Sequence, residues 1–341
     1  MKLKTINCLR VAGVLFASAL VLTGCGNTDD AAGTGSGGTT TIVDPATGET
    51  VEVPTTEVNP SEVFTGGTEE DNAALAAINV TGPGGSEPVV EFNTPFSVTT
   101  HTSRLVSDGD GAALHDGQFV AINAAMWRAD NGEKVLSTWA DGYPESFILG
   151  GAQFTMLATL LQGQHVGARV LIANPTTLPT GESTTVLTIF EVESAVDILP
   201  RATGAAVDYD SDAVGVLVTL ADNGAPSIEI ADGFTPSSDL VVQTLIEGTG
   251  PVVTADQTLA VHYTGWLTNG EQFDSSWARD EPAVFPLTGV IAGWTQGLAG
   301  QRVGSQVLLI IPPELGYGDR AAGSIPPNST LIFVVDILYA E

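Results

Sequence analysis

The spacing of apolar residues in the last third of the chain predicts a β-strand followed by a hairpin turn. Large apolar side chains stand at Leu259, Val261 and Tyr263, every second position, which is the period of a strand. Asn269-Gly270 then separates two strand-like runs. This dipeptide favours a tight hairpin in which both turn residues adopt positive φ. The pattern therefore predicts an antiparallel pair of strands on either side of this turn.

Two further apolar runs and one helical segment complete the same region. Residues 307–311 are continuously apolar and stop at two prolines, while residues 330–338 are rich in β-branched side chains. Residues 294–299, which precede both runs, suit a short helix, with Trp294 and Leu298 on one face at spacing i, i+4. Many strands with one short helix predict an α+β fold, in which an antiparallel β-sheet folds over the helix.

The same patterns occur about 138 residues earlier, which indicates an internal duplication. The Asn-Gly pair at residues 131–132 precedes that at residues 269–270 by 138 positions, and Trp139 precedes Trp277 by the same distance. Other matched positions keep offsets of 137 to 139 along both halves. An offset that drifts so little predicts two tandem domains of one fold.

The pattern divides the chain into five segments. Residues 1–24 are expected to be a signal peptide, residues 25–71 a tether, residues 72–196 the first domain, residues 197–212 a linker and residues 213–341 the second domain. The linker assignment rests on its proline, its glycine and its acidic residues. The tether is rich in Gly, Thr, Ser and acidic residues and has no Lys or Arg, a composition that favours disorder.

The start of the chain has the pattern of a lipoprotein signal. Basic residues precede an apolar run at residues 11–22, which is too short to span a bilayer. The run ends in Leu22-Thr23-Gly24-Cys25, which resembles a bacterial lipobox with cleavage before Cys25 and lipidation of that cysteine. The alternative is an ordinary secretory signal with a coincidental cysteine. We therefore expect an extracytoplasmic protein that is lipid-anchored to the bacterial cell membrane.

Composition narrows the possible partners. The chain has 40 acidic and 11 basic residues and a net charge of −29, which excludes binding to phosphate backbones and charge-driven docking on anionic lipid. The lipid anchor is then the one expected membrane contact. Two cysteines rule out a disulfide framework and a cysteine-rich zinc site, and the four histidines are scattered. We expect no metal, no cofactor, no nucleic acid and a monomer.

Five short motifs follow one another in the second domain. They are Val261-His262-Tyr263-Thr264-Gly265, Gln272-Phe273-Asp274-Ser275-Ser276, Val290-Ile291-Ala292-Gly293-Trp294, Gly316-Tyr317-Gly318 and Ile325-Pro326-Pro327. In this order they closely resemble the FKBP-type peptidyl-prolyl cis–trans isomerases. The resemblance covers residues 240–341, under a third of the chain. Any one motif alone would be weak, whereas the ordered set is specific.

The resemblance implies a shallow apolar pocket lined with aromatic side chains. In the family, the tryptophan at the place of Trp294 forms the floor under the proline ring, and the tyrosine at the place of Tyr317 donates a hydrogen bond to a substrate carbonyl. Carried over by motif position, the residues expected to act in catalysis are Tyr263, Phe273, Asp274, Trp294, Tyr317 and Phe333. Those expected to bind substrate are Phe285, Val290, Ile291, Arg279 and Ile325, with Arg279 paired to Asp274.

The implied activity is cis–trans isomerisation of X–Pro bonds in unfolded or nascent secreted polypeptides. Rotation must break amide resonance, a barrier of roughly 18–20 kcal/mol, but makes no covalent bond. No nucleophile, metal or cofactor is therefore needed. The alternative function is a peptide-binding holdase or surface binding lipoprotein with little turnover. A third interpretation, an immunoglobulin-like structural module, leaves the ordered aromatic residues unexplained.

Several of these residues also have plainer interpretations. Trp294 and Phe333 could be ordinary core residues, and Asp274 with Arg279 could be a surface ion pair of little energetic consequence. The motif histidine, His262, is interpreted as a packed strand residue rather than a base, because the reaction transfers no proton. The ordered motifs favour the pocket over the core, and an orienting role for Asp274 on Tyr263.

The first domain lacks these chemistry-bearing residues. In the alignment of the two copies, Asn123 stands for Tyr263, Leu157 for Trp294 and Thr188 for Phe333. The turn and packing positions survive. We expect a degenerate copy that folds alike and does not isomerise proline. Its role is left open between binding unfolded chains, acting as a spacer and shaping the tether.

Overall fold

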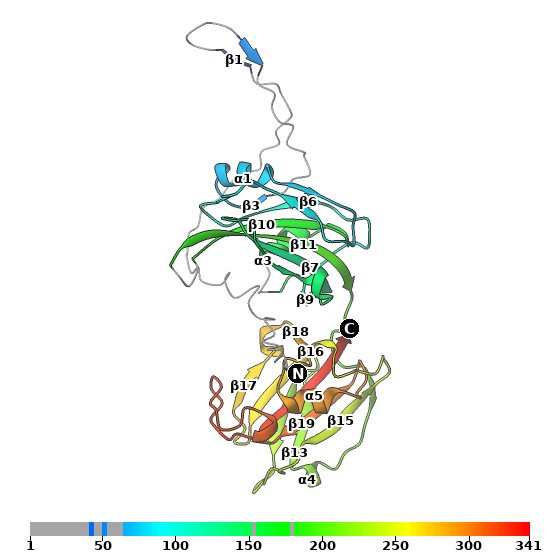
Figure 1. Cartoon of the computed structure of the whole chain (residues 1–341). Coiled ribbons are helices and arrows are strands. Elements are labelled where there is room, and N and C mark those ends of the chain that lie inside the picture. The colour runs from blue at the N-terminus through cyan, green and yellow to red at the C-terminus, as the bar shows by residue number, and fades with distance from the viewer. Residues whose placement is uncertain (1–40, 44–49, 53–63, 152–154, 178–180) are drawn as a thin grey trace, which may run out of the picture.

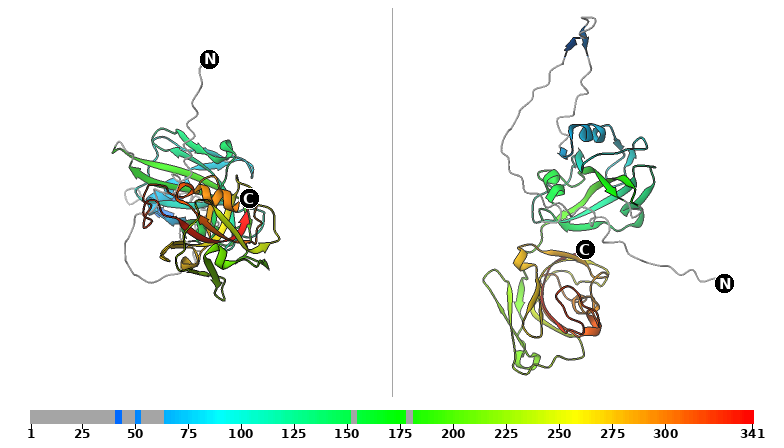
Figure 2. Two further views of the ribbon diagram at one scale, coloured as in Figure 1. Left: turned by 90° about the horizontal axis from the view of Figure 1, so that it is seen from below. Right: turned by 90° about the vertical axis from the view of Figure 1, so that its left-hand side faces the viewer.

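Two seven-stranded antiparallel sheets with matching strand orders form the framework of the computed structural model (Figure 1). The structure describes residues 41–43, 50–52, 64–151, 155–177 and 181–341. The expected signal peptide, Cys25 and most of the expected tether lie outside these ranges. The right-hand view of Figure 2 shows the two sheet-bearing parts one following the other along the molecule.

The first sheet has the order β3-β6-β10-β11-β7-β8, with β9 paired to β7. Its strands are β3 (Phe64–Gly66), β6 (Thr102–Ser107), β7 (Phe119–Arg128), β8 (Lys134–Ser137), β9 (Glu145–Ile148), β10 (Arg169–Thr177) and β11 (Ser183–Val196). Helix α3 (Thr155–Leu161) covers one face. The other face packs against α1 (Glu69–Ala76) and the hairpin of β4 (Asn79–Thr81) and β5 (Val89–Glu91). Together with α2 (Thr138–Asp141), these elements form what we call the first unit.

The second sheet repeats this order as β12-β15-β19-β20-β16-β17, with β18 paired to β16. Its strands are β12 (Gly204–Ala206), β15 (Val241–Gly248), β16 (Thr258–Leu267), β17 (Gln272–Ser275), β18 (Ala283–Pro286), β19 (Gln306–Ile311) and β20 (Leu331–Ala340). Helix α5 (Ala292–Leu298) covers one face. The other face is covered by α4 (Ser211–Val214) and by the hairpin of β13 (Val216–Leu220) and β14 (Pro226–Ile230). With the 3-10 helices η2 (Trp277–Arg279) and η3 (Pro313–Leu315), they form the second unit.

A two-stranded sheet pairs β1 (Thr41–Val43) with β2 (Thr50–Glu52), within the range expected to be a tether. In the described part of the chain, no helix combines the length and apolar character needed to cross a membrane.

Each central strand of the second sheet is buried on both faces. On β16, Val261 and Tyr263 face α5, whereas Trp266 packs under the β13–β14 hairpin. Alternate residues of a strand point to opposite sides, so both covers are needed to bury the whole strand. The α+β prediction of a sheet over a short helix is confirmed for this unit, and the hairpin on its second face is an addition to that prediction.

The hairpin after β16 has a different turn from the one expected. Gly270 has a φ of 84°, but Asn269 keeps a negative φ, so the expectation of two positive values is wrong. The connection is four residues long, and Gly270 N–H donates to the carbonyl of Leu267 at 2.9 Å. The Asn269 side chain accepts from the N–H of Glu271 at 3.0 Å. A longer loop spreads the reversal, and only its glycine needs the left-handed region.

Two of the expected domain boundaries also need correction. Strand β3 pairs with β6, so the first unit begins at Phe64 instead of residue 72. Strand β12 pairs with β15, so Gly204 belongs to the second sheet instead of the linker. Both are three-residue edge strands, too short to show any alternation in the sequence.

In each unit, a buried polar pair on the sheet also bonds to the backbone of a neighbouring segment. In the first unit, Arg169 Nε donates to Glu191 at 2.6 Å, and its other nitrogens donate to the carbonyls of Gly82 and Pro83. At the same register in the second unit, Gln306 donates to Asp336 at 2.7 Å. The backbone N–H of Ala202 donates to the other Asp336 oxygen at 2.8 Å. The same pair of register positions therefore holds a buried polar pair in both units, formed by different side chains.

Asp336 should make stability depend on pH. Burial raises its pKa to about 6 in spite of its two hydrogen bonds, against about 3.9 for an exposed aspartate. The folded state holds the proton to higher pH than the unfolded chain. The free energy of unfolding should therefore fall by about 3 kcal/mol as pH rises from about 4 to about 6, and then level off.

The measurement is urea unfolding of the native chain and of Asp336→Asn between pH 4 and 8. The variant should lack this part of the pH dependence. A free-energy difference between the two proteins that stays constant over the whole range would contradict the assignment.

Candidate active site in the second unit

Five aromatic rings from four strands and α5 meet on the helix side of the second sheet. The ring of Trp294 lies 5.3 Å from that of Tyr263, 5.7 Å from Phe285 and 5.3 Å from Phe333 between centroids. All three contacts are close to perpendicular, the edge-to-face geometry that aromatic pairs favour. Phe273 joins through Phe333 at 5.4 Å. We call these five residues the aromatic cluster, with Trp294 at its centre.

The backbone at Gly265 allows two of these rings to approach. Gly265 pairs with Phe333 across β16 and β20. A Cβ at this position would lie 2.5 Å from the Phe273 ring and 2.7 Å from the Phe333 ring, closer than any real contact. The sequence motif contained this glycine, but sequence reasoning gave it no role. Its structural role is to leave space for the cluster.

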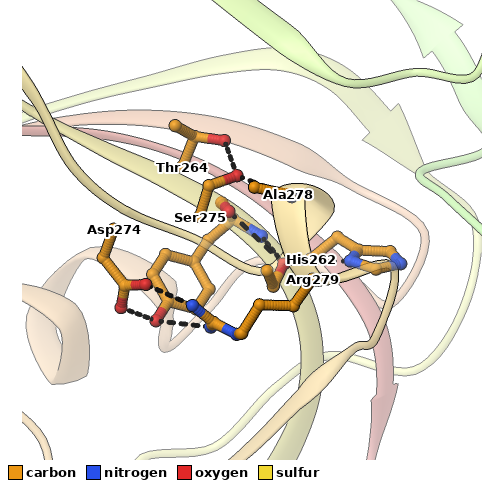
Figure 3. A network of polar contacts seen from close by, with 8 residues as sticks. His262, Thr264, Asp274, Ser275, Ala278 and Arg279 are labelled. Atoms are coloured by element: carbon orange, nitrogen blue, oxygen red, sulfur yellow. Dashed lines mark hydrogen bonds and ion pairs between the residues drawn. The ribbon is translucent and has the colours of Figure 1, made fainter.

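Polar groups connect the cluster to its rim (Figure 3). The Tyr263 hydroxyl donates to one carboxylate oxygen of Asp274, and the Arg279 guanidinium donates to the other. Arg279 Nη2 lies 3.4 Å from the Tyr263 hydroxyl oxygen. The Asp274–Arg279 pair is partly exposed, but its bond to a buried tyrosine supports an orienting role over an isolated surface ion pair.

The protonation states of this triad exclude acid–base work near neutral pH. Burial raises the pKa of Asp274, but the hydrogen bonds from Tyr263 and Arg279 outweigh burial and lower it on balance. Burial and the hydrogen bond to Asp274 raise the pKa of Tyr263 to about 12. Asp274 is therefore ionised and Tyr263 neutral, so the carboxylate fixes the hydroxyl and exchanges no proton.

His262 is a packed strand residue, as expected. Its ring stacks on that of Trp277 at 4.0 Å, and its Nδ1 lies 2.9 Å from Ser276 Oγ. Burial lowers the pKa of His262 to about 4, so the ring is neutral. Ser276 Oγ also accepts from the backbone N–H of Tyr263 at 2.8 Å. Ser276 thus holds β16 at the site, a role that sequence reasoning missed.

The remaining site residues divide into two groups. Val290, Ile291 and Ile325 pack against the core that contains the aromatic cluster. Tyr317 lies just after η3 with 44% of its surface exposed, and it is not a member of that packed core. The structure thus brings together the other ten expected residues, and the role of Tyr317 stays a prediction from the resemblance.

Two surface cavities lie elsewhere on the second unit. One, of about 410 Å³, is lined by β14 and the turn at Asn269 and Gly270. The other, of about 300 Å³, is lined by Arg201, Gln306 and Asp336 among others. The pocket over Trp294 therefore stays a prediction from the resemblance. Among the described residues, no three His, Cys, Asp or Glu side chains lie close enough to hold a metal ion.

The equivalent region of the first unit keeps the hydrogen bonds and lacks the rings. Ala124 N–H donates to Thr138 Oγ1 at 2.8 Å, the counterpart of the bond between Tyr263 and Ser276. Ala124, and not Asn123, therefore stands in the place of Tyr263, and the expected alignment was wrong by one residue. A one-residue shift moves a side chain to the opposite face of a strand. Asn123 matches His262 instead, since it accepts from Thr138 as His262 contacts Ser276.

Known proteins resemble the second unit. Residues 250–338 match the model of the FKBP-type peptidyl-prolyl cis-trans isomerase family. The FK506-binding protein of Streptomyces anulatus is 47% identical over 118 residues, which cover 33% of this chain and 94% of that protein. The FKBP-type peptidyl-prolyl cis-trans isomerase FkpA of Escherichia coli is 43% identical over 125 residues, 35% of this chain.

The share of each relative's length that this chain matches differs between the two proteins. The match spans 46% of the length of FkpA, so this chain covers about half of that protein. The crystal structure of FkpA aligns at 39% identity over 36% of this chain and 51% of that chain, with a TM-score of 0.29. The Streptomyces protein is covered almost entirely and at high identity. The chain therefore belongs to the FKBP-type peptidyl-prolyl cis–trans isomerase family.

Proposed function

We propose that the second unit catalyses cis–trans isomerisation of X–Pro bonds in unfolded or nascent polypeptides. The observation that carries this proposal is the aromatic cluster around Trp294, joined to the hydrogen-bonded Tyr263, Asp274 and Arg279. Family membership supports the same activity. The proposed substrates are proline-containing segments of secreted or surface proteins that have not yet folded.

Isomerisation of an X–Pro bond requires an apolar surface of the right shape and no reacting side chain. A planar amide has more charge separation than a twisted one, so a dry aromatic surface disfavours the planar state more than the twisted state. Trp294 is the proposed floor under the proline ring, while the Tyr317 hydroxyl donates to a substrate carbonyl. The buried rings offer no nucleophile, and none is needed because no covalent bond changes.

The required rate gain is modest. Uncatalysed isomerisation takes tens to hundreds of seconds. Bringing it to about 10 ms needs a factor near 10⁴, which corresponds to about 5.5 kcal/mol of barrier reduction. Positioning of the proline ring and exclusion of water from the amide are sufficient to supply this amount.

The first unit is, in this proposal, a degenerate copy of the second. The matching strand order and the matching bonds at Thr138 and Ser276 support a duplication. Ala124, Leu157 and Thr188 occupy the places of three rings of the cluster. Without a ring floor, this copy has no surface on which to twist an X–Pro bond.

The cellular setting is proposed from sequence alone. The Leu22-Thr23-Gly24-Cys25 pattern supports lipidation at Cys25 and a place outside the cytoplasm, on the cell membrane. The net charge of −29 supports polypeptide clients over nucleic acid. We propose that the chain acts as a monomer and without a cofactor.

A cis-to-trans assay on short X–Pro peptides tests the function, with Tyr317→Phe as its first variant. The full chain should accelerate isomerisation far above the uncatalysed rate. Losing one hydrogen-bond donor to the substrate should lower kcat/KM by about 10-fold, since such a bond is worth about 1–1.5 kcal/mol.

Tyr143→Phe is the matched control, because Tyr143 is 74% exposed in the first unit and outside the proposed site. It should leave the rate unchanged. A folded native chain that isomerises no faster than the uncatalysed reaction would favour the rival function, a peptide-binding holdase.

A further inference from the structure

The two units meet through an apolar cluster between their sheets. Phe119 and Ile148 come from the first unit, and Ala260 and Leu338 come from the second, and all four are almost fully buried. The rings of Phe119 and Tyr339 lie 4.9 Å apart between centroids. Figure 1 places the C-terminus and β9 at this junction, next to β18. We call these contacts the junction.

Polar and close contacts extend the junction toward the loop that carries Arg279. Ser146 Oγ on β9 donates to the Glu341 carboxylate at 2.9 Å. Gly151, three residues after β9, lies against the Glu281 carboxylate, since a Cβ at Gly151 would be 2.2 Å from Glu281 Oε1. Glu281 is two residues beyond Arg279, which holds Asp274. The first unit therefore touches the second unit next to the site rim.

Strand β18 connects the junction to the aromatic cluster. It is a four-residue edge strand that pairs with β16, where Val284 lies opposite Ala260 and Phe285 lies opposite Leu259. Val284 and Ala260 pack in the junction, whereas Phe285 and Leu259 pack in the core around Trp294. Adjacent residues of one short strand therefore face the two sides, one toward the first unit and one toward the site.

We infer that the first unit positions Phe285 for the reaction of the second unit. The inference rests on the proposed isomerase function and gives the degenerate copy a role. A four-residue edge strand has few contacts of its own, and such segments open locally at low free energy. Packing of Phe119 and Ile148 against the outer side of β18 holds Val284 in place. The Phe285 ring is thereby kept 5.7 Å from Trp294 and 6.0 Å from Tyr263. Val284 and the junction residues of the first unit are positioning residues, since none belongs to the aromatic cluster.

The test uses the full chain with Ile148→Asp. Ile148 packs in the junction and is not part of the core under α3, so the first unit should keep its fold. Burying an unpaired carboxylate between the units is unfavourable and should open the junction. Because Phe285 is expected to bind the proline segment, kcat/KM should fall about 5- to 10-fold, mostly through a higher KM.

Two further variants separate positioning from general damage. Ile148→Leu should keep the native KM, because leucine fills the same apolar contact between the units. Val135→Asp introduces the same charge at an exposed site of the first unit, where 49% of the valine surface is accessible, and should change nothing. Tyr339→Ser opens the same contact from the second unit and should reproduce the effect of Ile148→Asp.

A spectroscopic measurement makes the outcome independent of turnover. The chain has five tryptophans, so ¹⁹F NMR after 5-fluorotryptophan labelling gives few resonances, and Trp294→Leu assigns that of Trp294. Ile148→Asp should shift or broaden the Trp294 resonance and leave those of Trp127 and Trp139 in place. An active native chain with unchanged KM and an unchanged Trp294 resonance in Ile148→Asp would overturn the inference. An inactive native chain would instead refute the proposed function.

Discussion

Trp294→Leu should lower kcat/KM for an X–Pro peptide by about 30-fold or more in a protein that remains folded. The Trp294 ring contacts those of Tyr263, Phe285 and Phe333 together. Removing most of an aromatic surface from a binding floor costs about 2–3 kcal/mol of apolar contact, and about 2 kcal/mol corresponds to a 30-fold change in rate. Steady-state isomerisation of a short peptide measures the effect.

Trp266→Leu is the control for this variant. Trp266 is equally buried, but it lies on the opposite face of the same sheet, under the β13–β14 hairpin. Both substitutions should cost about 2–4 kcal/mol of stability, since each leaves a cavity. If the two variants lose activity equally, the loss comes from weakened folding and the assigned floor is wrong.

Arg169→Met should destabilise the first unit by about 3–5 kcal/mol, the largest stability effect that we expect of a single substitution. Both partners of the Arg169–Glu191 pair are buried, and removal of the cation leaves a carboxylate without its charge partner. The carbonyls of Gly82 and Pro83 lose their donors as well. Hydrogen exchange of the β10 and β11 amides reports the free energy of opening of this unit.

The duplicate supplies the matched control. Gln306→Met removes the corresponding donor in the second unit, where Asp336 keeps the N–H of Ala202, so the cost there should be nearer 1–2 kcal/mol. Adding Glu191→Gln to Arg169→Met should recover part of the loss, because no charge is then left buried. Equal costs for Arg169→Met and Gln306→Met would show that the buried charge is of no consequence.

Local sequence signals predicted much of the second unit. Strands β16, β19 and β20 and helix α5 follow from alternation, apolar runs and spacing, all of which act within a few residues. The site residues came from ordered motifs, and most of them do converge on Trp294. The convergence itself is a long-range property, because the rings come from four strands and one helix that are far apart in the sequence.

Long-range pairing accounts for what sequence reasoning missed. The strand pairing of Phe64 with Arg104 depends on a partner 40 residues away, and nothing near Phe64 in the sequence indicates it. The register of Ala124 against Tyr263 became clear only from the hydroxyls of Thr138 and Ser276. The faces of Val284 and Phe285 are likewise set by packing partners in two different units.

The short connection between the units has a further consequence. Seven residues, 197–203, join β11 to β12, and Ile198 and Leu199 among them already pack at the junction. Fully extended, this peptide spans about 25 Å, so an opened pair of units stays within a small volume.

A connection of this length corresponds to an effective concentration of about 1 mM for one unit near the other. If the two units bound each other with a Kd of only about 0.1 mM as separate molecules, the joined units would then be in contact about ten times as often as apart. Linkage through the backbone thus lets a modest contact area hold the two halves together, and lengthening the connection with Gly-Ser repeats would loosen them without changing a single side chain at the contact.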